Sequence, residues 1–237
     1  MSWFELDPQS ISARVKASGA PANAPTLAGS LFRGMAGFTI VSAAGFMPWV
    51  LAGKWFYRNP GELTMYASCA AIFMGLSGLI LHPLIIGPGS LKRFYIFFSV
   101  AFGAYAAGWI GGWMGLSGQT MHLRSIVGLL IGTAIMGNVF GIAFDARGEI
   151  LKIIAALFVL NSLGYFVGGL IEGALAQAKE LNLMGLSLSG AGLDVFMKAM
   201  WGVCYGLGFG AGLGLSFYAA QCKARALLSQ EQPQTSL

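Results

Sequence analysis

Long apolar stretches, separated by short polar segments, dominate the pattern of hydrophobic and polar positions along the chain. Six of them hold no Asp, Glu, Lys or Arg, and each is close to or longer than the roughly 20 residues that a helix needs to cross a bilayer core of about 30 Å. The runs are continuously apolar, whereas strands of a membrane barrel alternate, so the pattern predicts transmembrane helices. The expected crossings are residues 34–53, 63–91, 94–123, 125–144, 153–171 and 199–222.

Composition indicates the same environment. Hydrophobic residues make up 56% of the 237 positions and charged residues only 10%, against roughly a quarter charged in a typical soluble domain. So few charges could not cover a surface that faces water. The expected fold class is therefore all-α, a polytopic bundle of six transmembrane helices surrounded by the lipid bilayer.

Polar segments lie at both ends of this bundle. Residues 1–27 lack the basic start, short apolar run and cleavage site of a signal peptide, so the first crossing is expected to act as the targeting signal. Trp3 and Phe4 lie beside charged residues, which favours an arm along the membrane surface. Residues 28–221 are expected to form the transmembrane domain and residues 222–237 a polar tail.

Lys and Arg are distributed unevenly between the two sides of the membrane. With six crossings, both termini share one side, which carries nine basic residues against five on the other. Cytoplasmic loops are enriched in Lys and Arg, so both termini are expected in the cytoplasm, in a plasma or inner membrane. This distribution accounts for the net charge of +5 without a nucleic-acid partner. The nine are Arg14, Lys16, Arg33, Lys92, Arg93, Arg147, Lys152, Lys223 and Arg225, and the five are Lys54, Arg58, Arg124, Lys179 and Lys198.

The second half of the chain repeats features of the first. The stretch AAIFMGLSG from Ala70 resembles AALFVLNSLG from Ala155. The first crossing aligns with the fourth, which pairs Arg33 with Arg124, and the third crossing aligns with the sixth. This agreement in all three pairs favours a duplication, although 35 glycines in the chain allow part of it to be compositional.

Small residues at every fourth position mark one face of the third and of the sixth crossing. Four residues advance about 400° around a helix axis, so they form a stripe along which two backbones can approach closely. We expect the third and sixth helices to pack through these stripes. Further glycines on the first and fourth crossings favour a homo-oligomer or a larger membrane complex. The stripes are Gly103, Ala107, Gly111 and Gly115, and Gly202, Gly206, Gly210 and Gly214.

Three crossings per repeat is an odd number, so the second repeat must enter the membrane from the other side. The expected repeats are residues 28–116 and 123–221, inverted relative to each other. Inverted repeats recur in transporters and channels, with the solute site near the midplane where the halves meet. Neither repeat carries the Asn-Pro-Ala signature of water and glycerol channels.

Four polar side chains in or at the ends of the crossings are candidates for lining a conduit. Asn138 and Asn161 need hydrogen-bond partners in hydrocarbon, so they either join helices together or face a conduit. Glu172 either surfaces at the interface or faces a cavity. His82 precedes Pro83, which can kink the helix, and is either an interfacial or hydrogen-bonded residue or a ligand.

Catalytic and cofactor chemistry is not indicated. The sequence GLSG at 75–78 and 115–118 is similar to the Gly-x-Ser-Gly of rhomboid-type intramembrane proteases, but His82 shares a helix with Ser77 and no base is placed. Cys69, Cys204 and Cys222 lack metal-ligand spacing. We therefore expect no enzyme, no cofactor and no metal.

The longest connection between crossings, residues 177–194, has charges at its ends and leucines at its centre. We expect a short amphipathic helix at the interface, with an inward-dipping gate as the alternative.

Two functions fit these features. The first is a channel or transporter that conducts a small solute between inverted halves, because repeats are combined with few charges at the midplane. The second is a structural or assembly subunit whose glycine-rich faces hold a membrane complex together.

Overall fold

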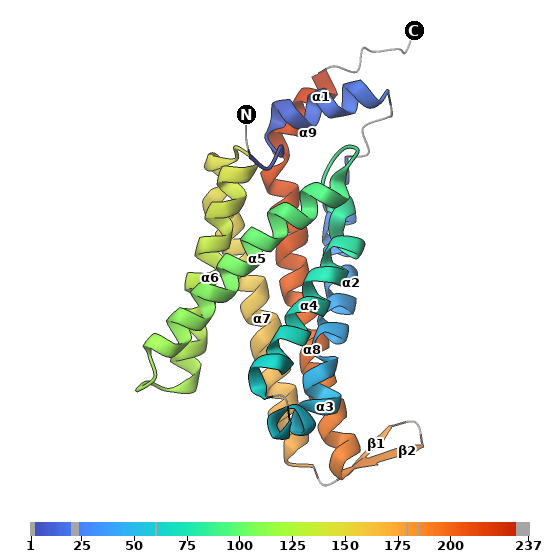
Figure 1. The fold of residues 1–237 in the computed structure, drawn as a ribbon, viewed down its shortest axis with the longest axis vertical. Helices are drawn as coiled ribbons and strands as arrows, with labels where there is room; N and C mark the ends of the chain where they lie inside the picture. Colours follow the sequence, from blue (N-terminus) through green and yellow to red (C-terminus); the bar gives the residue numbers. More distant parts are fainter. Residues whose placement is uncertain (1–2, 20–23, 60, 179, 184, 231–237) are drawn as a thin grey trace.

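The computed structural model describes residues 3–19, 24–59, 61–178, 180–183 and 185–230. The chain folds into an elongated bundle of long helices, with the first helix, α1 (Pro8–Ser18), and the last, α9 (Cys222–Gln230), at the same end (Figure 1). We call this end the terminal face and the other end the opposite face.

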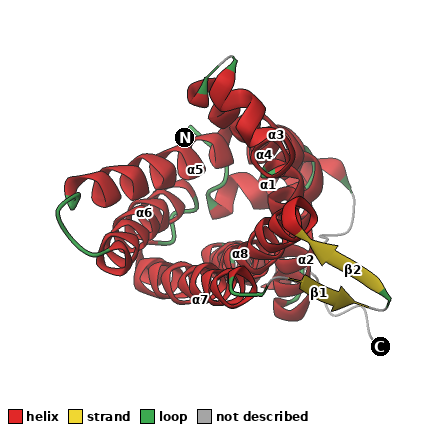
Figure 2. Ribbon diagram, turned by 90° about the horizontal axis from the view of Figure 1, so that it is seen from below, coloured by secondary structure: helices red, strands yellow, loops and turns green. Residues whose placement is uncertain are grey.

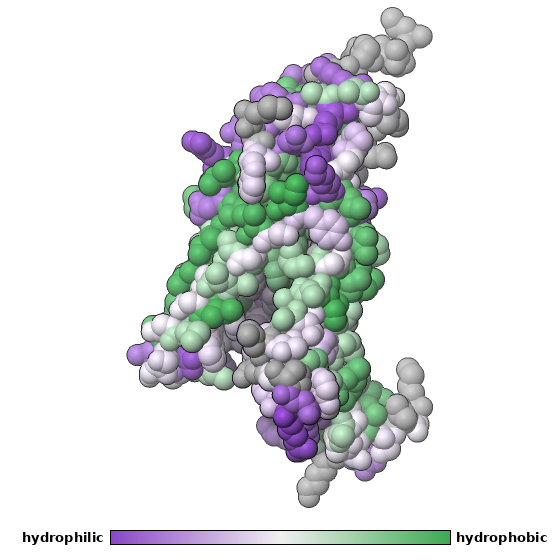
Figure 3. Space-filling model, viewed as in Figure 1, coloured by the Kyte–Doolittle hydropathy of each residue, from purple (hydrophilic) through white to green (hydrophobic). Residues whose placement is uncertain are grey.

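Six helical segments of the described chain are long and apolar enough to cross a membrane, as predicted. Large apolar side chains such as Ile40, Leu79, Ile142 and Leu170 are exposed on their outer surfaces, and Figure 3 shows apolar residues over the middle of the molecule and polar ones toward its ends. This is the surface of an integral membrane protein. The first segment comprises α2 (Leu27–Gly45) and α3 (Met47–Arg58), and the others are centred on α4 (Glu62–Leu81), α5 (Ser90–Gly115), α6 (Met121–Ala143), α7 (Ile150–Ala176) and α8 (Gly190–Ala220).

Local sequence sets where several of these helices begin and end. Thr26 caps α2 by accepting a hydrogen bond from the Gly29 N–H at 3.0 Å. Pro48 lies in the first turn of α3, where its missing N–H costs nothing, so a new helix starts there after α2 ends. Pro83 likewise follows the end of α4, and the chain continues as the short 3₁₀ helix η1 (His82–Leu84). A second one, η2 (Arg147–Glu149), precedes α7.

The N-terminal arm forms a helix that lies across the terminal face. Asp7 caps α1 by accepting a hydrogen bond from the Ser10 N–H at 3.0 Å. Leu6, Ile11 and Val15 are buried in the hydrophobic core, whereas Trp3 is 78% exposed. The segment expected as a polar tail begins with a helix, α9, which packs on α1, and residues 231–237 lie outside the described chain.

Gln221, buried at the end of α8, ties the loop between α4 and α5 to the last helix. Its Oε1 accepts a hydrogen bond from the Ile86 N–H at 2.8 Å, and its Nε2 donates to the Leu84 carbonyl at 2.8 Å. On the same face Lys223 forms an ion pair of 3.2 Å with Asp145, which follows α6. The terminal loops of both halves of the chain are therefore attached to the end of α8.

The long connection on the opposite face is a β-hairpin rather than the expected amphipathic helix. Strand β1 (Glu180–Leu183) pairs antiparallel with β2 (Leu186–Ser189), and Gly185 between them has a positive φ of 87°. That conformation suits glycine in a tight turn. Figures 1 and 2 show the hairpin extending from the start of α8 away from the bundle, rather than dipping into it as a gate would. Lys179, one of its flanking charges, lies outside the described residues.

Glycines on two sides of α8 bring it close to α2 and α7. A Cβ added at Gly210 would lie 2.8 Å from the Gly34 carbonyl carbon of α2, and one at Gly164 of α7 would lie 2.9 Å from the Gly208 Cα. Neither substitution fits without moving backbone. The stripe Gly202, Gly206, Gly210 and Gly214 therefore faces the first crossing, so the expected pairing of the third and sixth crossings through glycines is wrong.

The third crossing packs on the fourth through a different row of glycines. A Cβ at Gly108 of α5 would lie 3.2 Å from the Gly132 Cα of α6, and a Cβ at Gly112 of α5 would lie 3.1 Å from the Gly128 Cα of α6. The expected stripe on α5 lies on another side of the helix: Ala107 is exposed, and a Cβ at Gly103, Gly111 or Gly115 would have no neighbour within 4 Å. This stripe faces outward, away from α8.

Aromatic rings fill the space between α5, α6 and α8 toward the terminal face. The ring centroids of Phe97 and Phe140 lie 4.7 Å apart, and those of Phe140 and Phe217 lie 4.9 Å apart. Helices α5 and α8 thus meet through large side chains rather than through backbones. This phenylalanine cluster comprises six buried residues, Phe94, Phe97, Phe98, Phe140, Phe144 and Phe217.

Candidate functional site

A polar cluster lies in the apolar interior where α5, α7 and α8 meet. The Asn161 Nδ2 of α7 donates a hydrogen bond to the Tyr105 hydroxyl of α5 at 2.9 Å, and that hydroxyl lies 3.5 Å from the Tyr205 hydroxyl of α8. Each residue lies within one turn of the middle of its helix, so the group is near the membrane midplane. We call these three residues the tyrosine–asparagine cluster.

The cluster leaves one strong acceptor unused. Asn161 is fully buried, yet its Oδ1 has no hydrogen-bond partner among the described residues, and neither has the hydroxyl of the adjacent Ser162. A buried amide oxygen without a donor costs about 1–3 kcal/mol. An oxygen of this kind is an attachment point for the N–H or O–H group of a small molecule, and an apolar side chain of similar size would be the cheaper choice for packing alone.

Further polar and aromatic groups extend the cluster toward α6. The Ser125 hydroxyl of α6 lies 3.2 Å from the Tyr165 hydroxyl of α7. The rings of Tyr165 and Trp201 meet edge to face with their centroids 5.6 Å apart. The rings of Trp201 and Tyr205 are stacked, with centroids 5.4 Å apart and an interplanar angle of 4°. A row of hydroxyl groups and ring faces therefore connects the fourth crossing to the midplane.

Helices α4 and α5 are in contact toward the terminal face and separate toward the opposite face. The Tyr95 hydroxyl of α5 donates a hydrogen bond of 2.6 Å to the Gly75 carbonyl of α4. The Phe102 ring of α5 stacks on the Phe73 ring of α4 with the two centroids 6.0 Å apart. Both contacts lie in the half of the bundle nearer the terminal face or at its middle. Beyond them α4 and α5 diverge (Figures 1 and 2), and Figure 3 shows a hollow between their lower parts.

The phenylalanine cluster lies toward the terminal face. Its six rings are buried, with at most 1% of any residue exposed. Leu84 and Ile86 of the adjoining loop are fully buried above it. Packed aromatic rings thus separate the tyrosine–asparagine cluster from the terminal face.

The structure separates the four residues that the sequence singled out. Asn161 lies in the cluster just described. Asn138 is exposed on the outer surface of α6, with its Nδ2 bonded to the Ala134 carbonyl of its own helix at 2.8 Å, so it neither meets Asn161 nor lines an interior space. Glu172 lies half-buried near the opposite end of α7.

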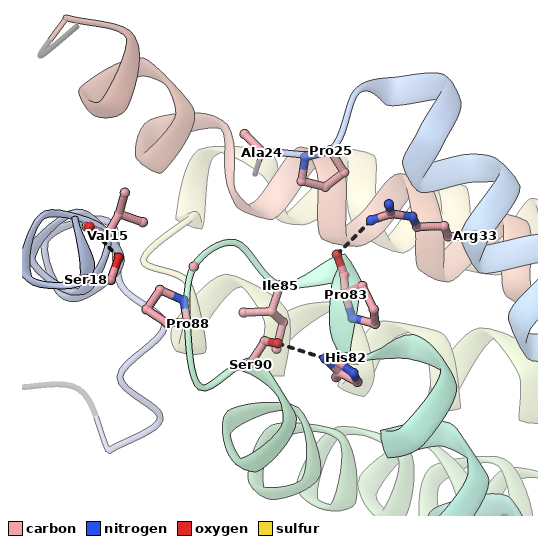
Figure 4. A pocket seen from close by; sticks show the side chains of 11 residues that line it. Val15, Ser18, Ala24, Pro25, Arg33, His82, Pro83, Ile85, Pro88 and Ser90 are labelled. Atoms are coloured by element: carbon pink, nitrogen blue, oxygen red, sulfur yellow. Dashed lines mark hydrogen bonds between the residues drawn. The ribbon is translucent and has the colours of Figure 1, made fainter. Parts of the chain in front are cut away.

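The fourth residue, His82, lines a separate cavity of about 520 Å³ at the terminal face. Figure 4 shows that the residues lining this cavity come from α1, the start of α2 and the loop that leads into α5. The His82 Nδ1 lies 2.9 Å from the Ser90 hydroxyl, and the Arg33 Nη1 donates a long hydrogen bond of 3.4 Å to the Pro83 carbonyl. His82 therefore has Ser90 as its partner, while the buried Ser77 hydroxyl has none among the described residues.

Sequence reasoning missed Tyr105, Tyr165 and Tyr205. In an apolar helix a tyrosine is difficult to distinguish from a packing aromatic, because its hydroxyl is one atom on a large ring. One signal was present: Tyr105 follows Gly103 and Tyr205 follows Gly202 at nearly the same place in the aligned third and sixth crossings.

Metal chemistry has no support in the described part of the chain, where no group of three His, Cys, Asp or Glu side chains is close enough to hold an ion. Comparison with models of protein families, with curated proteins and with solved structures finds no match to the chain. Its function must therefore be argued from the two sites themselves.

Proposed function

We propose that the protein transports a small, uncharged solute across the membrane, and that the solute binds at the tyrosine–asparagine cluster. The observation that carries this proposal is the fully buried Asn161 side chain, whose oxygen has no partner at the midplane. Solute sites of membrane transporters commonly lie at this depth, between the two halves of the chain.

The arrangement of helices supports an inverted repeat. The first crossing packs on the sixth through glycines, and the fourth packs on the third in the same manner. If the two halves are interchanged, the first crossing takes the place of the fourth and the sixth that of the third, so each of these two contacts becomes the other. Ser77 and Ser162 hold equivalent positions in the aligned stretches, and both hydroxyls are buried without partners among the described residues. Tyr105 belongs to the first half and Asn161 to the second, so the cluster lies between the repeats.

The side chains of the cluster favour a neutral solute. Two phenolic hydroxyls and one amide can donate and accept hydrogen bonds, and the rings of Tyr105, Tyr205 and Phe209 offer apolar surface. None of these groups is charged. A charged solute at the midplane would need a counter-ion, which makes urea-like or polyol-like molecules the appropriate class.

The three side chains of the tyrosine–asparagine cluster are at most 7% exposed, so the proposed transporter is closed around its solute site. The rings of the phenylalanine cluster block passage from this site to the terminal face. Transport would require these rings to separate.

A flux assay in proteoliposomes tests the proposal. Entry of urea, glycerol and acetamide would be followed by stopped-flow light scattering, with empty liposomes as the background. We expect at least one solute to enter faster than background, and Asn161→Leu to reduce that excess at least about tenfold, the factor equivalent to about 1.4 kcal/mol. The matched control is Asn138→Leu, which makes the same change on the outer surface and should retain wild-type flux.

Two results would contradict this proposal. Flux at the background level for every solute, with correctly folded protein in the liposomes, would reject transport. An equal loss of flux in Asn138→Leu and Asn161→Leu would mean that the solute does not pass the cluster.

The second candidate function, a subunit of a membrane complex, is supported by the outward stripe on α5. Gly103, Gly111 and Gly115 would accept a Cβ without any neighbour within 4 Å, and such a surface lets a further helix approach closely. Mass measurement of the protein extracted in native lipid discs tests this function: a stoichiometric partner that leaves on Gly111→Leu would favour assembly, and a lone chain would oppose it.

We further propose that the terminal face lies in the cytoplasm, because it carries most of the basic residues. Protease digestion of an epitope tag added after Leu237, in intact cells and in inverted vesicles, tests the orientation. A tag that is cleaved in intact cells would reverse it.

A further inference from the structure

We propose that the cavity beneath α1 binds a phosphate group, and that Arg33 is its principal ligand. This site is separate from the tyrosine–asparagine cluster and does not depend on transport. A cavity of about 520 Å³ falls within the roughly 300–1,000 Å³ of small-molecule sites. It is lined by Val15 and Ser18 of α1, by Ala24 and Pro25 before α2, and by the loop into α5, and is partly open to solvent (Figure 4).

Polar groups in the cavity are mostly hydrogen-bond donors. The Arg33 guanidinium uses one N–H in the 3.4 Å contact with the Pro83 carbonyl and has five N–H groups in all, arranged in a fork that matches phosphate oxygens. The Ser90 hydroxyl lies against His82 at 2.9 Å on the facing wall. No Asp or Glu is among the described residues that line the cavity, so nothing there repels an anion.

A second guanidinium lies behind one wall, and none of the described carboxylates forms an ion pair with it. Arg93 is only 4% exposed, and its Nη2 donates to the carbonyls of Ile86, Gly87 and Pro88 at 3.1, 3.2 and 2.7 Å. Its Nη1 has no hydrogen-bond partner among the described residues. Gly87 lines the cavity, and a Cβ added to it would lie 3.8 Å from the Arg93 Nη2.

A buried charge without a counter-ion is costly, and a bound anion would relieve that cost. The first turn of α5, which starts at Ser90 without a side-chain cap, adds positive potential to the same wall. The nearby Arg14 guanidinium is paired with the Glu5 carboxylate, so among the described residues the two unpaired positive charges at the cavity are those of Arg33 and Arg93. An anion of one or two charges is therefore favoured over a neutral ligand.

The remaining walls are apolar. Val15, Pro25, Pro83 and Ile85 would contact a carbon skeleton attached to the phosphate. The cavity lies at the end of the first two membrane crossings, at the depth of lipid headgroups. Both the headgroup of an anionic phospholipid and a water-soluble phosphate could supply the same group, and the experiment must distinguish them.

The test uses the full-length protein in phosphatidylcholine nanodiscs. One arm adds phosphatidylglycerol and counts bound lipids by native mass spectrometry. The other adds inorganic phosphate and measures the unfolding midpoint, with chloride at equal ionic strength as reference. We expect Arg33→Gln to weaken the binding that is observed at least about tenfold, the range for a lost charge-assisted hydrogen bond. The matched control is Lys92→Gln, which removes an exposed charge from the same face but not from the cavity lining.

Each outcome is decisive. Binding of phosphatidylglycerol that depends on Arg33 identifies a lipid site, and a phosphate-dependent midpoint that depends on Arg33 identifies a soluble ligand. Equal effects of Arg33→Gln and Lys92→Gln, or no selectivity over phosphatidylcholine and chloride, overturn the proposal. If Arg33→Gln fails to fold, Ser90→Ala provides the second variant and should weaken binding by a smaller factor, whereas unchanged binding in Ser90→Ala would refute the site.

Discussion

Exchanging glycine for alanine at two positions of the third and sixth crossings gives a direct test of the packing. In Gly210→Ala the new Cβ would lie 2.8 Å from the Gly34 carbonyl carbon and 2.9 Å from the Phe38 Cβ, where carbon atoms normally keep about 3.5–4.0 Å apart. Helices α2 and α8 would have to separate by about 1 Å. Because the obstacle is backbone, no side-chain rotation relieves it, and we expect a destabilisation of about 1–3 kcal/mol.

Gly111→Ala provides the matched control, since the sequence alignment makes it the counterpart of Gly210. Its new Cβ would meet nothing within 4 Å, and alanine favours a helix over glycine by up to about 1 kcal/mol. We expect it to leave stability unchanged or to raise it. The free energy of unfolding would be measured for both variants by denaturant titration in bicelles. Equal destabilisation by the two substitutions would refute the reasoning, because it would mean that the α5 stripe is packed against another helix.

Two further predictions concern buried hydrogen bonds and use the same measurement. Tyr105→Phe removes the acceptor of the Asn161 Nδ2 and should lower the free energy of unfolding by about 1–3 kcal/mol. The same substitution should cost much less in a chain that already carries Asn161→Leu. Equal costs in the two backgrounds would contradict the hydrogen bond. Gln221→Leu leaves the Ile86 N–H and the Leu84 carbonyl without partners and should cost about 2 kcal/mol or more. Gln230→Leu, on the exposed end of α9, should change stability little. Similar effects of both glutamine variants would mean that the hydrogen bonds of Gln221 do not stabilise the fold.

The six crossings and several of their ends could be predicted from the sequence, because length, apolar composition and proline act locally. The stretch around Pro48 is one example: a residue without an N–H fits the first turn of a helix and kinks or breaks its interior, so a break in the first crossing is expected there. The hairpin could also have been found. Leu181, Leu183, Leu186 and Leu188 alternate on both sides of Gly185, which is a period of two and is typical of strands.

The partner of each helix could not be predicted in the same way. Helix α5 carries two glycine rows at the same spacing, one through Gly103 and Gly111 and one through Gly108 and Gly112. Only the second is packed, because the neighbouring α6 presents Gly128 and Gly132 to it. Spacing defines a face, but which neighbour covers that face depends on the packing of the whole bundle. The same limit applied to Asn138 and Asn161, which look alike in the sequence and lie in opposite environments.

The attachments of Gln221 and Lys223 make the terminal face a pivot. They join the end of α8 to the loops beside α5 and α6, whereas the far end of α6 meets α7 through the Ser125 and Tyr165 hydroxyls, which lie 3.2 Å apart. Helix α6 has 23 residues, so it is a lever about 35 Å long. A rotation of about 10° at the fixed end would swing its tip by about 6 Å, which is enough to separate the Ser125 and Tyr165 hydroxyls and to interrupt the row of polar groups that leads to the midplane.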